Sequence, residues 1–153
     1  MPYFSHIKID TLRNLESVEL KPNRFTNIIY GENGSGKTSI LEALSVIAHG
    51  RSFRTRKYQY VINKDKPSYT LFAQLLQTKD SKELTKPLNV GVLRNRQGAI
   101  QIKIDGEKIM SAGHLAQNVP MLIIDGNSFQ LLEGSAKERR QFFDWLVLSL
   151  IHI

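Results

Sequence analysis

Alternating apolar and polar residues predict β structure at the start of the chain. In residues 3–10 the apolar side chains would occupy one face of a strand and the polar side chains the other, and residues 18–20 alternate in the same way. Residues 25–30 form a short run that is almost continuously apolar at its end, as is typical of a strand buried on both faces in a parallel sheet. Three strands are therefore expected before residue 31.

A glycine-rich stretch follows, and beyond it the period of the pattern changes from that of a strand to that of a helix. Apolar residues then recur along one helical face up to a predicted stop at Gly50. Strand-like patterns return in residues 69–77, 88–92 and 100–104, and the Asp-Gly pair at 105–106 is a strong signal for a hairpin turn. The middle of the chain is predicted to be antiparallel sheet.

The last part of the chain is expected to add one strand and one helix. Residues 119–125 have the composition of another buried strand. Ser135 and Glu138 have the spacing of a capping box, which would begin a helix there. The apolar run at 148–153 has no helix C-cap, so we expect the sequence to stop inside a longer protein.

The strongest chemical signal lies between the apolar run at 25–30 and the first predicted helix. Gly31, Gly36, Lys37 and Thr38 match every fixed position of the pattern G-x-x-x-x-G-K-[ST]. Glycines let the backbone wrap closely around a triphosphate, Lys37 would place its ammonium on the β- and γ-phosphates, and the Thr38 hydroxyl would coordinate Mg²⁺. The predicted nucleotide site consists of Gly31, Glu32, Asn33, Gly34, Ser35, Gly36, Lys37, Thr38 and Ser39.

The predicted cofactors are ATP and Mg²⁺. A guanine-specific N-K-x-D pattern is absent, because no residue separates Lys64 from Asp65 in the similar stretch at 63–65. The alternative reading of the loop is a plain glycine turn with a solvated Lys37. The strand predicted before the loop and the amphipathic helix predicted after it favour phosphate binding.

The net charge of the chain indicates which kind of partner it binds. The 153-residue chain carries 21 Lys and Arg against 14 Asp and Glu, a net charge of +7, which favours anionic partners such as nucleic acid. Arg51, Arg54, Arg56 and Lys57 lie among aromatic residues, and we predict that they contact nucleic acid. The alternative is a solvated loop whose aromatic side chains anchor it to the core. A second basic pair, at 139–140, is a weaker candidate for the same role.

Several classes of site are excluded or disfavoured. The chain has no cysteine, which rules out disulfides and cysteine-ligated zinc, and its four histidines lack metal-ligand spacing. Neither a signal peptide nor a membrane-length apolar window is visible, so a cytoplasmic protein without membrane contact is expected. Asp125 could order Mg²⁺ at a strand end, but Gly126 follows where a catalytic glutamate would be expected, so no catalytic residue is predicted.

The motifs together resemble those of the ABC-type ATPase heads of the RecF and SMC families. Residues 27–44 resemble the P-loop segment of these heads, and the Leu-Arg-Asn at 12–14 resembles their opening Phe-Arg-Asn. Residues 50–55 resemble the stretch after the P-loop helix in RecF, and residues 131–134 and 139–144 resemble the segment leading into its helical arm. Four matches in the right order are far more specific than the P-loop alone. One departure is the Gly-Asn pair that stands where the family usually has proline and an acidic residue.

The resemblance implies an α/β, P-loop NTPase fold: an ABC-ATPase-like head with a mixed sheet of antiparallel and parallel core strands, incomplete at the C-terminus. Residues 1–134 would be the N-terminal portion of the head and residues 135–153 the start of a helical arm. The signature motif and the Walker B Asp-Glu pair lie later in the family. The chain alone is therefore expected to be inactive, and the full-length protein to be a slow DNA-dependent ATPase.

The resemblance also implies a DNA replication and repair protein. It would bind single-stranded, gapped or linear double-stranded DNA, dimerise with ATP, and act with RecO-, RecR- and RecA-type proteins in RecA loading and the SOS response. The alternatives are an SMC-like or defence-nuclease ATPase head, a small-molecule P-loop kinase, and a non-catalytic nucleic-acid-binding module that depends on the charge of +7.

Overall fold

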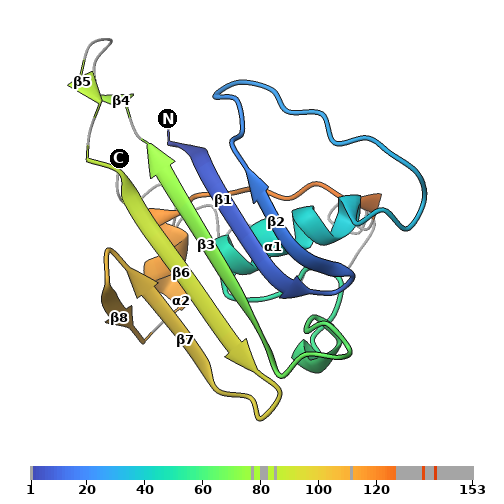
Figure 1. Cartoon of the computed structure of the whole chain (residues 1–153). Helices are drawn as coiled ribbons and strands as arrows, with labels where there is room; N and C mark the ends of the chain where they lie inside the picture. The colour runs from blue at the N-terminus through green and yellow to red at the C-terminus, as the bar shows by residue number, and fades with distance from the viewer. Residues whose placement is uncertain are drawn as a thin grey trace.

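A six-stranded sheet with helices on one face dominates the computed structural model (Figure 1). The structure describes residues 2–126, apart from 77, 80–82, 85 and 111, together with Ala136 and Arg140. The strand order is β2-β1-β3-β6-β7-β8, and every neighbouring pair of strands in this sheet is antiparallel. Strands β4 and β5 form a small separate hairpin.

The elements follow the chain in a simple order. The strands are β1 (Tyr3–Leu12), β2 (Leu15–Leu20), β3 (Ser68–Leu76), β4 (Thr78–Lys79), β5 (Glu83–Leu84), β6 (Leu88–Asn95), β7 (Ile100–Ile104) and β8 (Glu107–Ile109). The helices are α1 (Lys37–His49), the 3₁₀ turn η1 (Tyr58–Tyr60) and α2 (Ala112–Asn118). The predicted strands at 3–10, 18–20, 88–92 and 100–104, the helix ending before Gly50 and the hairpin at 105–106 are confirmed, with small shifts at the ends. The strand predicted at 69–77 is confirmed as far as Leu76, and residue 77 lies outside the described residues.

The turn between β1 and β2 is tight and places its two residues beside the P-loop helix. Leu12 pairs with Leu15, so only Arg13 and Asn14 connect the strands. Thr11 and Arg13 both have positive φ, at 58° and 56°, a backbone conformation that costs free energy in residues with a Cβ. The chain tolerates this conformation where Arg13 and Asn14 make several side-chain hydrogen bonds.

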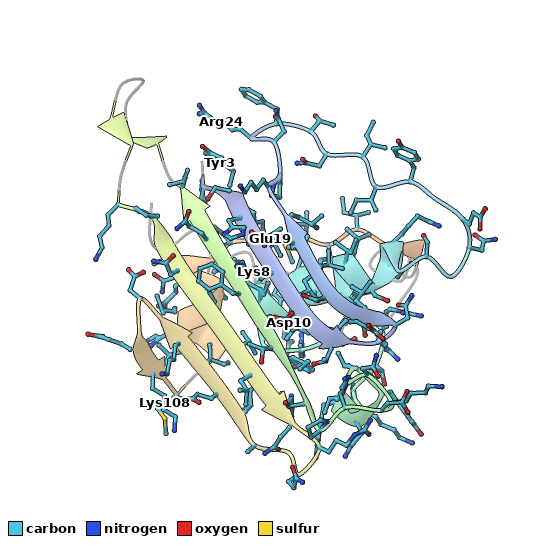
Figure 2. The ribbon with its side chains drawn as sticks, in the orientation of Figure 1. Tyr3, Lys8, Asp10, Glu19, Arg24 and Lys108 are labelled. Carbon is cyan, nitrogen blue, oxygen red and sulfur yellow. The ribbon has the colours of Figure 1, made fainter. Side chains whose placement is uncertain are left out.

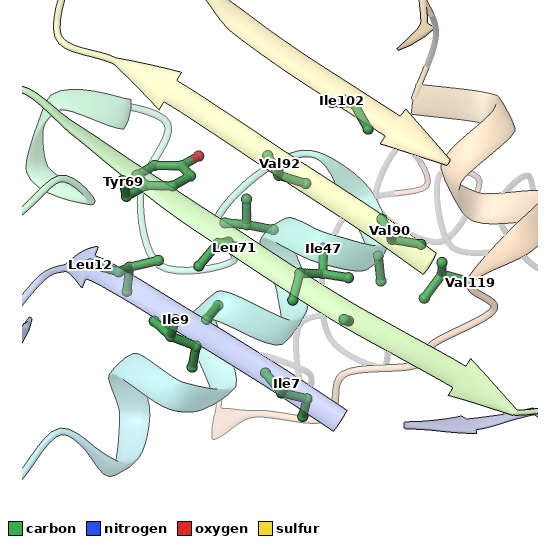
Figure 3. Close-up of a cluster of buried hydrophobic side chains, with 14 of the residues drawn as sticks. Ile7, Ile9, Leu12, Ile47, Tyr69, Leu71, Val90, Val92, Ile102 and Val119 are labelled. Carbon is green, nitrogen blue, oxygen red and sulfur yellow. The ribbon is translucent and has the colours of Figure 1, made fainter. Parts of the chain in front are cut away.

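The hydrophobic core lies between one face of the sheet and the helices (Figure 3). Along β3, alternate residues are buried, and α1 packs against them with residues from its middle and end. The largest fully buried apolar side chains are Tyr69, Ile7, Ile9, Leu12, Ile47, Leu71, Leu115, Val46, Val90, Val92 and Val119. The core thereby fixes α1 and the turn before β2 relative to each other.

Two predicted buried strands are not formed. Residues 25–30 are irregular and project from the sheet in an arc (Figure 1), with Phe25, Ile28 and Tyr30 more than 80% exposed. Residues 120–125 are also irregular, and Leu122 and Ile124 are 53% and 80% exposed. The prediction failed here because an apolar segment becomes a strand only when a neighbouring strand bonds its N–H and C=O groups. Among the described strands no pair is parallel.

The predicted helix after Ser135 and the arm-like segments at 131–134 and 139–144 lie outside the described residues, except for Ala136 and Arg140. Within the part of the chain that the structure describes, no helix is long and apolar enough to cross a membrane.

Candidate nucleotide-binding site

The glycines of the loop at 31–36 adopt backbone conformations that other residues avoid. Gly31, Gly34 and Gly36 have φ values of 144°, 84° and 95°. At Gly36 a Cβ would also lie 2.5 Å from Leu15 Cδ2, so the buried Leu15 side chain would have to shift to admit it. The loop therefore needs glycine at this position both for its backbone and for its contact with β2.

The loop ends at the N-terminus of α1, where backbone donors have no acceptor within the helix. The first backbone hydrogen bond of the helix runs from the Ile40 N–H to the Gly36 carbonyl, 3.0 Å away. The N–H groups of residues 37–39 precede it, no side chain caps the helix, and its first turn has no acidic residue. Converging N–H groups and the positive end of the helix dipole make this end suited to an anion.

Lys37 folds back over the loop. Its Nζ donates hydrogen bonds to the carbonyl oxygens of Gly31, at 2.8 Å, and Glu32, at 2.6 Å. The side chain is partly exposed, so a phosphate group can reach the ammonium from solvent. The lysine holds the two ends of the loop together and places a positive charge at the mouth of the cradle.

Asn14 links the tip of the loop to the first turn of α1. Its Nδ2 donates to the Gly34 carbonyl at 2.8 Å, and its Oδ1 accepts from the Ser39 hydroxyl at 2.8 Å. Ser39 is only 5% exposed, so its hydroxyl belongs to this scaffold and only its backbone N–H can face a phosphate. Thr38 is exposed, and its hydroxyl can reach a metal ion in the mouth of the site.

Glu42 is a fully buried carboxylate, 0% exposed, in the middle of α1. Arg13 binds it through two hydrogen bonds, Nε to Oε2 and Nη2 to Oε1, each 2.8 Å long. The Ser52 hydroxyl donates to Oε1, and Arg54 Nη1 lies 3.4 Å from Oε2. Burial raises the pKa of Glu42, but the hydrogen bonds from Arg13 and Ser52 and the charges of Arg13 and Arg54 outweigh it and hold the pKa below its ordinary value.

A family model for the RecF/RecN/SMC N terminal domain matches residues 3–129, which include the P-loop, the turn before β2 and Glu42. The chain belongs to the RecF/RecN/SMC N-terminal domain family.

The individual relatives agree with this family. The DNA replication and repair protein RecF of Teredinibacter turnerae is 49% identical over 150 residues, which are 98% of this chain and 38% of the relative. RecF of Saccharophagus degradans is 46% identical over 152 residues, or 99% of this chain and 40% of the relative. The chain thus spans about two fifths of the length of these curated relatives.

Solved structures share the fold. The structure of the recombination mediator protein RecF-ATPrS in the RecFOR pathway matches with a TM-score of 0.81 at 25% identity, over 97% of this chain and 38% of that one. A structure from work on ATP-driven dimerization and DNA stimulated activation of SMC ATPases matches with a TM-score of 0.72 over 94% of this chain and 99% of that one. The latter is 14% identical and shows the fold alone. This chain therefore shares its fold with RecF and with SMC ATPases.

In this member of the RecF/RecN/SMC family, the predicted nucleic-acid residues lie on the loop after α1. The side chains of Arg51, Arg54, Arg56 and Lys57 are all exposed. The loop is anchored from below, because the Arg94 guanidinium lies 4.1 Å from the ring centroid of the half-buried Tyr58. The aromatic anchor expected for a solvated basic loop is therefore present, and contact of the four basic residues with nucleic acid stays a prediction.

The other candidates are less well placed. Asp125 lies at the end of the irregular segment after α2, partly buried, and not at the end of a strand. Among the described residues no group of three or more potential metal ligands occurs. Arg139 is outside the described residues, and Arg140 is described as exposed.

Two residues that organise the site were not predicted to do so. Asn14 enters the sequence analysis only through the Leu-Arg-Asn resemblance, and Glu42 only through the resemblance of residues 27–44 to the P-loop segment. The buried face of α1 carries Ser39, Glu42 and Ser45 beside its apolar residues, so apolar periodicity alone gave no signal for Glu42. Its complete burial is explained by its pairing with Arg13, because a carboxylate is almost never fully buried unless it is paired.

Proposed function

We propose that this chain is the N-terminal part of an ATP-binding DNA replication and repair protein of the RecF type. The observation that carries the proposal is the cradle of glycines, Lys37 and free helix N–H groups, found in a chain with 49% identity to a RecF. Because the chain spans about two fifths of its relatives, the activity of the whole protein is part of the proposal. An SMC-like head has less support, since the SMC structures share only 14–17% identity with the chain.

ATP would bind with its phosphates against Gly31, Glu32, Asn33, Gly34, Ser35, Gly36, Lys37, Thr38 and Ser39. A solved relative described as RecF-ATP supports the choice of nucleotide. Lys37 would exchange its loop carbonyls for phosphate oxygens. Mg²⁺ would be held by the exposed Thr38 hydroxyl with phosphate oxygens and waters, which suits an ion that keeps most of its waters. When bound, it would neutralise phosphate charge.

The parallel core expected of an ABC-type head would form when the rest of the protein is present. Along residues 121–125, exposed positions alternate with partly buried ones, which is the burial pattern of a strand covered on one face. Its exposed side chains, Leu122 and Ile124, are apolar, as are Phe25 and Ile28 in the other unpaired segment. We infer that both segments become core strands when further strands pair with them.

DNA would bind at Arg51, Arg54, Arg56 and Lys57, which are exposed and close to the P-loop helix through the contact of Arg54 with Glu42. The full-length protein would dimerise with ATP and work in the cytoplasm with RecO-, RecR- and RecA-type proteins. Hydrolysis would require the signature and Walker B residues that the family carries later in its sequence, so this chain alone would bind nucleotide and turn over little of it.

The test is binding of labelled ATP with Mg²⁺ and of a labelled gapped duplex to the purified chain. We expect both to bind, and no transfer of the γ-phosphate to small alcohols or sugars. A chain that phosphorylates a small metabolite without DNA would contradict the proposal and favour a P-loop kinase. A chain that binds DNA with no ATP binding would favour the non-catalytic nucleic-acid module.

A further inference from the structure

The positive charge of this chain is concentrated in one stretch. Residues 51–66 contain six Lys or Arg residues and a single acidic residue, so that they contribute +5 of the net charge of +7. Four of the six, Arg51, Arg54, Arg56 and Lys57, belong to the loop already proposed to contact DNA. The other two are Lys64 and Lys66, which lie beyond the turn η1 on a second loop.

Two arginines at the end of β6 hold both loops at the same end of the sheet. Arg94 lies against the ring of Tyr58 on the first loop. Arg96 clamps the second loop: its Nε donates to the Lys66 carbonyl at 2.8 Å, and its Nη2 donates to the carbonyls of Asn63 and Lys64 at 2.7 and 2.8 Å. The two loops therefore form one surface whose shape is set by β6.

Lys64 and Lys66 are exposed on this surface, and no ion pair between described residues occupies their side chains. Arg96 bonds only their backbone carbonyls, which leaves both ammonium groups to solvent. The half-buried Arg96 side chain orders a loop that carries two solvated lysines, which costs conformational entropy, and a polyanionic partner would make use of the ordered charges.

The surface suits nucleic acid better than a membrane. The large apolar side chain most exposed in residues 51–66 is Tyr60, at 61%, and the Lys57 Nζ lies 5.8 Å from its ring centroid. Aromatic rings beside cations stack well on unpaired bases. Binding to a lipid surface instead calls for an amphipathic helix with an aliphatic face, and among these residues only the three-residue turn η1 is helical.

We propose that residues 51–66, backed by Arg94 and Arg96, form a continuous surface for the phosphate backbone of nucleic acid, and that Lys64 and Lys66 are contact residues on it. This inference rests on the proposed DNA-binding function and extends it to a second loop. It predicts that the two lysines contribute to affinity through charge, without reading sequence.

The experiment measures the affinity of the chain for a labelled duplex over a range of salt concentrations. Lys64→Ala with Lys66→Ala should reduce the slope of log K against log salt by about 1.8, because each phosphate contact on duplex DNA contributes about 0.9. The matched control is Lys103→Ala with Lys108→Ala, which removes the same charge from exposed, paired positions on β7 and β8. Figure 2 labels Lys108 on β8. The control should leave the slope unchanged.

The possible failures are distinct. The wild-type chain and both double variants could bind duplex DNA with the same slope of log K against log salt. In that case the second loop is not a contact surface, the inference is overturned, and the proposed DNA binding is retained at other residues. If the wild-type chain binds no DNA at low salt, the proposed function itself fails. If vesicles with anionic headgroups bind and lose affinity in the Lys64 and Lys66 variant while DNA does not bind, the surface is for lipid and the inference is overturned.

Discussion

Arg13 and Glu42 join the turn between β1 and β2 to the middle of the P-loop helix through two parallel hydrogen bonds of 2.8 Å. The carboxylate is completely buried, whereas the arginine side chain is 22% exposed. A paired geometry of this kind is the strong form of a charged hydrogen bond, and it fixes direction as well as distance. The turn, the helix and the loop carrying Ser52 and Arg54 therefore meet at one carboxylate.

Arg13→Ala should destabilise the chain by about 3–5 kcal/mol, since it leaves a buried carboxylate without its main partner. Urea unfolding followed by circular dichroism measures this change. Adding Glu42→Gln to Arg13→Ala should recover part of the loss, because an uncharged amide is less costly to bury unpaired. A cost below about 1 kcal/mol for Arg13→Ala would place the pair among weak surface ion pairs and contradict its structural role.

Asn14→Ala should weaken ATP binding by roughly tenfold, because the loop tip and α1 each lose a hydrogen bond worth about 1 kcal/mol net. Ser39→Ala removes the bond to Asn14 Oδ1 and keeps the bond to the Gly34 carbonyl, so its loss of affinity should be smaller. Titration calorimetry with ATP measures both variants. Equal affinity of Asn14→Ala and the wild type would show that the loop holds its shape without Asn14.

Gly36→Ala and Gly34→Ala separate crowding from backbone strain. Both glycines have positive φ, which should cost either alanine variant about 1–2 kcal/mol of stability. Only at Gly36 does the new Cβ also meet Leu15, which should add about 1–3 kcal/mol of overpacking. Thermal and urea unfolding of the two variants measures the difference. Equal destabilisation of the two would mean that Leu15 moves aside freely.

The sequence alone predicted the elements whose backbone hydrogen-bond partners lie among the described residues. The alternation in β1, β3, β6 and β7 was visible because each strand packs against other elements among the described residues. The apolar periodicity of α1 predicted the helix but not its buried face, since Leu41 is 49% exposed and Glu42 is buried. The runs at 25–30 and 119–125 have equally apolar composition, but no described strand pairs with them. The apolar composition of a segment indicates a tendency to be buried, but it does not show whether a neighbouring strand is present to pair with it.

The sequence predicted the loop residues of the candidate site but not the long-range contacts that support them. The loop residues follow a pattern set by the shape of a triphosphate, so all of them could be named. The contacts of Asn14 with Gly34 and of Arg13 with Glu42 join residues 20 and 29 positions apart in sequence. Such contacts depend on how the turn and α1 pack, which no local pattern encodes.

Stability should fall in mild acid through His49. Burial lowers the pKa of this imidazole below its ordinary value of about 6.5, the nearby Arg51 charge lowers it further, and the hydrogen bond to the Met121 carbonyl offsets this in part. The unfolded chain then binds the proton more tightly than the folded chain. The contribution is therefore fully present above pH 6.5 and is lost as the pH falls below it towards the folded-state pKa.

Unfolding in urea at about pH 7.5 and about pH 5.5 checks this prediction. The wild type should lose more stability between the two pH values than His49→Gln, which does not titrate. Other groups that titrate in this range are common to both proteins and cancel in the comparison. An equal loss in both proteins would show that His49 accepts its proton without cost.

The most direct test of the central claim is binding of ATP with Mg²⁺ to the 153-residue chain and to its Lys37→Ala variant, measured by calorimetry at equal protein concentration. Lys8→Ala is a control that removes the same charge from the outer face of β1 (Figure 2). The account predicts that the wild type and the Lys8 variant bind ATP, and that Lys37→Ala, still folded by circular dichroism, has no measurable binding. Equal affinity of the wild type and Lys37→Ala would contradict the assignment of residues 31–39 as the nucleotide site.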